Sequence, residues 1–361
     1  MADWAEFNVD LLVEIARRIK TYEDFIKFRL VCSPWKSAAL RVTCFNFPWL
    51  ILPPKQCSYF VDFFIASKDA TSTRKLSQVV GKKYYSSKGW LMTISQHLSM
   101  HLLHPFSLRG IDLPHLKTFK DWEKSTTCKP YIFFISKFFL SANPSLTSDY
   151  TVMVIQSCRG MLAYYRPGDK VWTTIDTYYG RYFDITHYKG LFYALDCCGR
   201  IMVCNIKGDH PTIAHQAAQV PFKLLQRGFL EYGYIVESGG KLLVISREGT
   251  HTSNYGSSRF QVFEVDLSTM TLSEIKHLGN RALFLGHNSS FSVDALTLLY
   301  CKPNCIYFTD DCTDGYWTIP GGGGKNMGIY NLQDESVVPV FSGNSLSRVN
   351  PPMWVEKVEY S

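Results

Sequence analysis

The spacing of apolar residues changes once along this chain of 361 residues, and that change limits the folds open to it. Across residues 8–40 the apolar side chains recur at the spacing of amphipathic helices. Beyond residue 45 the period falls to two, and short apolar runs separated by Gly, Pro, Asn and Asp continue to the end. The sequence therefore predicts a small all-α module, residues 1–44, followed by an all-β domain, residues 45–361.

Start signals divide the first module into three short helices. Asn8 suits an N-cap position, because its side-chain oxygen can accept a hydrogen bond from a free amide of the first turn. Thr21 with Asp24 forms a capping box for the second helix. Ser33 followed by Pro34 predicts the start of the third, since proline is tolerated where no amide donor is needed.

The three helices carry more apolar surface than about 40 residues can enclose. We expect another molecule to cover the excess; the alternative is that the helices pack only on the rest of the chain. The apolar side chains concerned are Leu11, Leu12, Ile15, Phe25, Phe28, Val31 and Trp35.

Residues 7–39, FNVDLLVEIARRIKTYEDFIKFRLVCSPWKSAA, resemble an F-box, whose motif reads Leu-Pro-x-Asp-Leu-Leu, then Ile, then Arg-x-Val-Cys-x-x-Trp. Phe7 and Asn8 replace the Leu-Pro opening. The resemblance implies that the helices dock on a Skp-type adaptor and link the protein to a cullin-RING ubiquitin ligase. It assigns adaptor binding to Phe7, Leu11, Leu12, Ile15, Val31, Cys32 and Trp35.

A repeated phrase in the second part, a tight turn leading into an apolar strand, predicts a β-propeller. Examples are KGWLMTIS at 88–95, RGMLAYY at 159–165, KGLFYALD at 189–196, GGKLLVIS at 239–246 and PNCIYFTD at 303–310. Gly190 and Gly240 lie 50 residues apart, and this spacing is close to the length of one kelch blade. About 24 strands would give roughly six blades, with five or seven as alternatives. A β-sandwich or barrel is the structural alternative.

Closing a propeller requires the two ends of its chain to meet in one sheet. We therefore expect a strand near residues 49–52 to share a blade with C-terminal strands at 337–341 or 354–358.

Phrases at 86–94, 101–107, 187–206 and 329–337 resemble the plant SKIP-type F-box proteins, which carry a C-terminal kelch-like propeller. The resemblance implies a non-catalytic substrate receptor of an SCF-type (Skp–cullin–F-box) E3 ubiquitin ligase, in which the propeller binds a protein target. Such a receptor works by proximity, because it raises the effective concentration of the target's lysines near the conjugating enzyme. The alternative is a propeller scaffold or enzyme whose N-terminal helices only pack on the rest of the chain.

No catalytic, metal or cofactor motif is complete in this sequence. IPGGGGKN at 319–326 departs from a phosphate-binding loop at its first and last positions, which favours a flexible connection. Cys301, Cys305 and Cys312 lack a second ligand pair at zinc spacing, so we expect buried thiols. The opening MADWAEFN has neither the basic nor the apolar region of a secretory signal, so nucleus or cytoplasm is expected.

The excess of positive charge lies entirely in residues 51–130, which hold 12 basic and 5 acidic side chains. Lys82, Lys83 and Arg109 are therefore proposed to bring cations onto one rim that binds an acidic or phosphorylated target segment. A solvated lysine-rich face without a partner is the alternative. Nucleic acid fits poorly, because residues 131–361 are nearly neutral.

Overall fold

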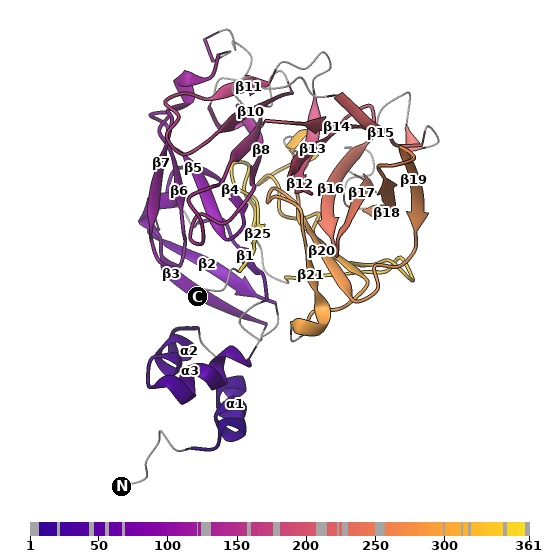
Figure 1. Ribbon diagram of the computed structural model, residues 1–361. Coiled ribbons are helices and arrows are strands. Elements are labelled where there is room, and N and C mark those ends of the chain that lie inside the picture. The colour runs from indigo at the N-terminus through magenta and orange to yellow at the C-terminus, as the bar shows by residue number, and fades with distance from the viewer. Residues whose placement is uncertain are drawn as a thin grey trace.

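The computed structural model shows three helices followed by a ring of β-sheets (Figure 1). The structure describes residues 7–19, 22–42, 47–54, 58–66, 69–120, 122–123, 131–156, 160–175, 181–206, 215–221, 224–225, 230–249, 256, 258–298, 300–311, 313–316, 319–341 and 345–357. No helix among these residues has both the length and the apolar character needed to cross a bilayer.

The helical module comprises α1 (Val9–Arg18), α2 (Tyr22–Arg29) and α3 (Ser33–Leu40). The Asn8 side chain accepts a hydrogen bond from the Asp10 amide at 2.8 Å, so the predicted cap of α1 is confirmed. Helix α3 begins one residue earlier than predicted, with Cys32 as its N-cap and no side-chain cap bond. Thr21 and the predicted boundary at 44/45 lie outside the described residues.

The described residues form six sheets, arranged as the blades of a propeller. Blades 1 to 3 contain, in sheet order, β25 (Met353–Val355), β1 (Trp49–Ile51), β2 (Phe60–Ile65) and β3 (Ala70–Lys75); β4 (Lys83–Ser87), β5 (Trp90–Ile94), β6 (Met100–Leu103) and β7 (Gly110–Leu113); and β8 (Ile135–Leu140), β9 (Val152–Gln156), β10 (Met161–Tyr165) and β11 (Thr173–Ile175).

Blades 4 and 5 have the same four-stranded order, and the sixth has five strands. They contain β12 (Tyr182–Tyr188), β13 (Leu191–Asp196), β14 (Arg200–Cys204) and β15 (His215–Gln219); β16 (Tyr232–Ser238), β17 (Lys241–Glu248), β18 (Arg259–Asp266) and β19 (Thr271–Ile275); and β21 (Phe291–Asp294), β20 (Arg281–Leu285), β22 (Cys305–Phe308), β23 (Gly328–Asn331) and β24 (Val337–Val338). Short helical turns are η1 (Ser77–Val79), η2 (Leu116–Thr118), η3 (Tyr131–Phe133), η5 (Ala295–Thr297) and α4 (Thr313–Tyr316).

The predicted repeat corresponds to real strands, and the blade count of six is confirmed. Blade 6 differs from the rest, because β20 pairs in parallel with β22 while β21 lies on its other side. The chain therefore crosses over β20 on its way from β21 to β22.

The ring closes where the first strand of the propeller meets the last. β25 pairs antiparallel with β1, with Trp49 opposite Val355 and Ile51 opposite Met353. This confirms the expected meeting of the chain ends, in the second of the two C-terminal positions predicted. Neighbouring side chains of β25 point to opposite faces, so Met353 and Val355 join one buried cluster and Trp354 joins another.

The propeller has two ends, and the helices join only one of them. Trp49 opens β1 after the helices, so we call its end the helix-side end (Figure 1). At the opposite end, which we call the far end, the Asn350 side chain donates a hydrogen bond to the Lys82 carbonyl at 2.7 Å, just before β25 and β4 begin.

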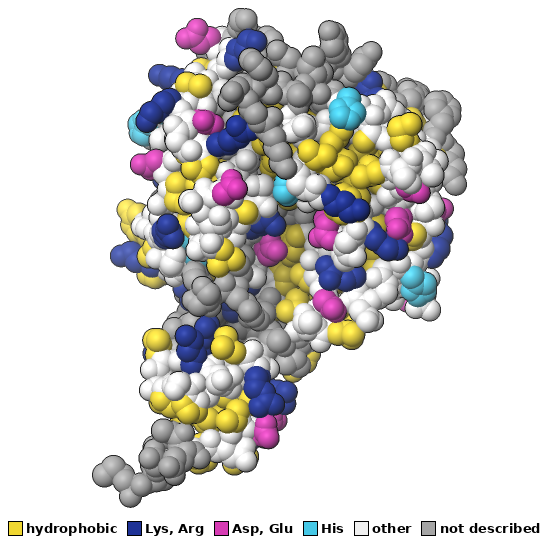
Figure 2. All heavy atoms as spheres, viewed as in Figure 1, with side chains coloured by type: hydrophobic (Ala, Val, Ile, Leu, Met, Phe, Trp, Pro, Cys, Tyr) yellow, Lys and Arg dark blue, Asp and Glu magenta, His cyan; other side chains and the backbone are white. Residues whose placement is uncertain are grey.

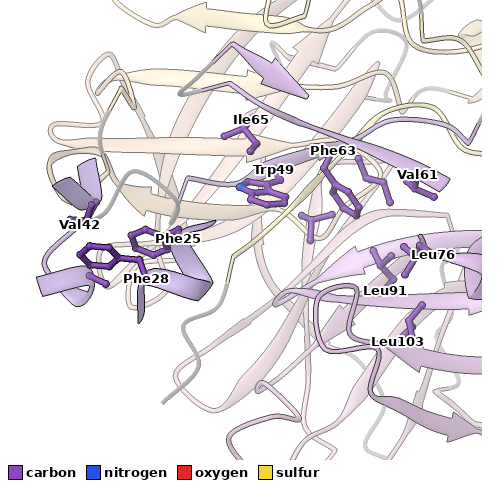
Figure 3. Close-up of a cluster of buried hydrophobic side chains, with 14 of the residues drawn as sticks. Phe25, Phe28, Val42, Trp49, Val61, Phe63, Ile65, Leu76, Leu91 and Leu103 are labelled. Atoms are coloured by element: carbon purple, nitrogen blue, oxygen red, sulfur yellow. The ribbon is translucent and has the colours of Figure 1, made fainter. Parts of the chain in front are cut away.

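One buried cluster extends from the helices into the first two blades (Figure 3). Phe25 and Phe28 of the helical module lie on one side of the view, Trp49 and Phe63 of blade 1 in the middle, and Leu91 of blade 2 beyond them. Burial of these apolar side chains is the main stabilising contribution at the junction.

Candidate functional site

The helical module leaves large apolar side chains in contact with solvent. Leu11, Ile15 and Val31 are 54%, 40% and 55% exposed, although each belongs to the F-box-like pattern. Figure 2 shows apolar side chains on the surface of this module. Clustered exposed apolar residues on a small module are typical of an interface. The exposed set is Val9, Leu11, Ile15, Leu30, Val31 and Leu40.

Other residues assigned to adaptor binding lie inside the module or at its edge. Leu12 is fully buried among Val13 and Ala16 of its own helix and the neighbouring helices. Trp35 is partly buried, with its ring centroid 4.5 Å from that of Phe28. Phe7 and Cys32 are half-buried. In this conformation Leu12 supports the shape of the helices, whereas Leu11, one position earlier, faces outward.

The axis of the propeller is filled by the segment Gly286–Ser290, between β20 and β21. The Ser289 amide donates to the Ser86 carbonyl of β4 at 2.8 Å, and the Lys137 ammonium of β8 donates to the Asn288 carbonyl at 3.1 Å. Gly286 has φ +155°, and an added Cβ would stand 1.9 Å from Thr309 Oγ1. Only glycine fits the start of this segment.

Buried charges surround this segment and hold neighbouring blades together. Lys137 Nζ lies 3.4 Å from Asp184 Oδ1 and 4.0 Å from Asp311 Oδ2. Arg247 Nη1 lies 3.1 Å from Asp311 Oδ1, which also accepts a hydrogen bond from the Tyr234 hydroxyl at 2.9 Å. We call Lys137, Asp184, Tyr234, Arg247 and Asp311 the axial network.

Burial and pairing act in opposite directions on the pKa values of the axial network. Burial raises the pKa of the Asp184 carboxyl, while Lys137 and Ser290 act to lower it. Burial disfavours the Arg247 charge, but Tyr234 and Asp311 outweigh it and raise the pKa of the guanidinium above its ordinary value. Because these groups contact one another, the network stabilises the ring; it does not present a reactive group to solvent.

The structure separates the residues predicted to form one basic rim. Across blade 2, Lys83 lies in register with Ile94, which places it at the far end. Arg109 precedes Gly110, which lies opposite Leu103 at the helix-side end. Lys82 and Arg109 therefore lie at opposite ends of the blade, because the length of a strand separates them.

Lys83 itself is buried, so it does not contribute to an exposed rim. Its ammonium donates to the Val349 carbonyl and lies 4.8 Å from the centre of the Tyr85 ring. Burial lowers the pKa of Lys83 from 10.5 to about 7.

Lys83 is expected to make the stability of the protein depend on pH between about 7 and 10.5. In this window the unfolded chain keeps the Lys83 proton that the folded protein releases, so the free energy of unfolding rises with pH. Urea denaturation at pH 7, 8, 9 and 10 should show a rise, on the order of a few kcal/mol, that is missing in Lys83→Met. Lys82→Met, at the half-buried neighbouring position, should keep the rise; equal slopes in all three proteins would contradict the prediction.

The glycine run at 319–326 is a packed element. The Gly323 amide donates to the Ser347 carbonyl at 3.0 Å, and the Gly324 amide donates to Asp310 Oδ2 at 2.7 Å. An added Cβ at Gly322 would stand 2.6 Å from the Arg348 amide nitrogen. The run is a connection between strands, as predicted, but the segment around Ser347 packs against it and leaves no room for side chains at Gly322 and Gly324, which argues against flexibility there.

The described residues contain no group of three or more His, Cys, Asp or Glu side chains placed to hold a metal ion. Cys301 and Cys305 are buried free thiols, and Cys312 lies outside the described residues. Burial raises the pKa of Cys301 to about 12. Sequence reasoning missed the axial network, because its members are far apart along the chain and each stands inside an ordinary apolar strand or turn.

The propeller also matches a known family model, the KIB1-4 beta-propeller, over residues 62–331. The chain belongs to this family. The matched residues run from β2 to β23 and so include part or all of every blade. The predicted likeness to plant F-box proteins with a C-terminal propeller is confirmed by this match and by the relatives of the chain.

Two of these relatives, both from Arabidopsis thaliana, are similar over nearly the whole chain. The putative F-box protein At5g55150 is 24% identical over 95% of this chain and 94% of its own. The F-box protein SKIP23 is 24% identical over 98% of this chain and 96% of its own. A solved structure, YCF48 from Cyanidioschyzon merolae, aligns with 63% of this chain and 68% of its own at 10% identity and a TM-score of 0.40.

Proposed function

We propose that this protein is the substrate-recognition subunit of an SCF-type E3 ubiquitin ligase. Residues 1–44 bind a Skp-type adaptor, and residues 45–361 bind a protein target in the nucleus or cytoplasm. The observation that carries the proposal is the helical module, which keeps Leu11, Ile15 and Val31 exposed beside a propeller of the KIB1-4 family. The F-box names of relatives that match nearly the full chain support it.

The receptor requires no catalytic residue of its own under this proposal. Holding a target beside the ubiquitin-conjugating enzyme raises the effective concentration of the target's lysines. The axial network is consistent with this role, because its charged groups are buried and bonded to one another. A rigid propeller keeps the target at a fixed position relative to the helices.

Adaptor binding is tested most directly with the double variant Leu11→Ala, Val31→Ala. We expect it to weaken binding of a purified Skp-type adaptor by about 2 kcal/mol for each side chain, the usual loss for apolar anchors that become buried in an interface. Isothermal titration calorimetry with the full-length protein measures the change. Leu12→Ala is a poorer test, since the buried Leu12 also supports the helices themselves.

The matched control is Leu146→Ala, Leu296→Ala, which removes two propeller side chains that are 60% and 71% exposed. This control should bind the adaptor like the unchanged protein. Equal binding by both double variants would reject the adaptor-docking role of the helices. It would favour the alternative, a propeller scaffold or enzyme whose helices only pack on the rest of the chain.

A further inference from the structure

Three cationic residues from distant parts of the chain lie at the far end of the propeller, on segments that are hydrogen-bonded to one another. Lys82 precedes β4, Lys325 follows the glycine run, and Arg348 precedes β25. Lys325 and Arg348 are exposed to solvent, and Lys82 is half-buried. We call these three residues the far-end cation cluster.

Backbone contacts join the three segments that carry the cluster. The Asn350 side chain donates to the Lys82 carbonyl at 2.7 Å and accepts a hydrogen bond from the Tyr84 amide at 3.1 Å. Gly323 and Ser347 exchange two backbone hydrogen bonds, of 3.0 and 2.9 Å. The segment that ends at Lys325 is thus bonded to the segment of Arg348, which in turn is bonded to that of Lys82.

The close contact between the glycine run and the segment of Arg348 requires glycine at Gly322 and Gly324. An added Cβ at Gly324 would stand 2.3 Å from the Ser345 carbonyl oxygen, and one at Gly322 would stand 2.7 Å from Arg348 Cγ. Gly322 and Gly324 have φ values of +89° and +124°, which side chains rarely adopt. The glycines let the segment that carries Lys325 pack directly against the segment of Arg348, with Gly322 against Arg348 and Gly324 against Ser345.

Asp310, which bonds to the glycine run, and its neighbour Asp311 face the interior. Asp310 Oδ2 accepts the hydrogen bond from the Gly324 amide, and Asp311 belongs to the axial network. Both aspartates are buried, at 0% and 3% exposure. Neither Lys82 nor Lys325 forms an ion pair with a residue that the structure describes. Both of these carboxylates are thus buried, whereas Lys325 is exposed.

We infer that the far-end cation cluster is the docking point for an acidic segment of the target protein, with carboxylate or phosphate side chains as its ligands. This inference rests on the proposed function, and it replaces the predicted rim of Lys82, Lys83 and Arg109. Charge complementarity supports it, because cations held on a bonded backbone attract anionic groups with little loss of conformational freedom. Lys117 and Lys120, exposed after β7, add positive charge at the same end.

The far end also suits a target on geometric grounds. The helices join the opposite end, so a target bound at the far end and an adaptor bound to the helices would contact different ends of the propeller. A nucleic acid is a weaker candidate, because binding to a phosphate backbone uses a longer basic stripe than three residues supply.

The test measures binding of fluorescein-labelled peptides, each about 15 residues long, to the full-length protein by fluorescence polarisation. The probes are a glutamate-rich peptide, the same peptide with two phosphoserines, a glutamine-rich peptide and a single-stranded DNA of about 20 nucleotides. We expect both acidic peptides to bind more tightly than the glutamine-rich peptide and the DNA. Their affinity should fall as salt rises, since exposed charges are screened.

The variant Lys82→Glu, Lys325→Glu, Arg348→Glu is expected to bind the acidic peptides at least about tenfold more weakly. The matched control is Arg109→Glu, Lys170→Glu, Lys189→Glu, which makes the same change in charge at exposed positions in turns of the helix-side end. The control should lose less than about twofold. The neutral variant Lys82→Gln, Lys325→Gln, Arg348→Gln, with an unchanged thermal midpoint, should also lose affinity and shows that misfolding is not the cause.

Three results would overturn the inference: equal losses in the two charge-reversed variants, no preference of the unchanged protein for acidic peptides, or tighter binding of the DNA. The adaptor titration separates this inference from the proposed function. Loss of adaptor binding by Leu11→Ala, Val31→Ala with peptide binding intact supports both. A protein that binds the acidic peptides but no adaptor would reject the proposed function and leave an acidic-segment site in place.

Discussion

Replacing Trp354 by alanine is expected to lower the free energy of unfolding of the full-length protein by about 3–5 kcal/mol. Trp354 is fully buried in the strand that closes the ring, and its ring centroid lies 5.0 Å from that of Phe284 and 5.9 Å from that of Tyr307. The substitution leaves a cavity at the seam between blades 1 and 6. Urea denaturation followed by tryptophan fluorescence and circular dichroism measures the loss.

Val338→Ala is the control for this prediction, because it truncates a strand residue of blade 6 that is 39% exposed. It should change the free energy of unfolding by no more than about 0.5 kcal/mol. A Trp354→Ala protein as stable as this control would show that the last strand is dispensable for the closed ring. A truncation after residue 352 should be at least as destabilising as Trp354→Ala, since it removes the whole strand.

Much of the fold follows from the spacing of apolar residues along the sequence. Turns such as Lys189–Gly190 precede short apolar strands, and the repetition of this pattern predicted both the strands and the number of blades. The pairing within blade 6 was beyond such an argument, because the apolar strand Arg281–Leu285 has no feature that selects a parallel partner. That pairing depends on the crossover of the chain over β20 between β21 and β22, which is a matter of tertiary packing.

The candidate sites were predictable only in part, and the reasons are physical. Leu11 and Leu12 match the F-box pattern equally well, yet neighbouring helical residues point roughly 100° apart, so one is exposed and the other buried. Lys82 and Arg109 share a stretch of excess positive charge, but the number of strands between them decides which end of the blade each occupies. Charge counts along the chain do not contain that information.

The second large effect is expected when the axial network loses one of its charged members. Asp311→Ala is expected to lower the free energy of unfolding by about 3–5 kcal/mol, because it leaves buried positive charge without its partner. Arg247 loses its carboxylate contact of 3.1 Å, and Tyr234 loses the acceptor of its 2.9 Å hydrogen bond. The three side chains come from blade 5 and from the segment after β22, so the loss weakens contacts between blades 5 and 6.

An exposed ion pair in the same blades provides the control. Arg259 Nε lies 3.3 Å from Glu335 Oε2, with both side chains at least half exposed, so Glu335→Ala should cost no more than about 1 kcal/mol. Asp311→Asn, which keeps the shape and one acceptor oxygen, should fall between the two alanine variants. If Asp311→Ala and Glu335→Ala lowered stability equally in urea, the buried pairing would contribute no more than a solvent-exposed contact, and apolar packing alone would hold the ring. We expect Asp311→Ala to lower stability more than Glu335→Ala. A guanidinium that stays charged and buried away from water after losing its carboxylate partner carries a large desolvation cost.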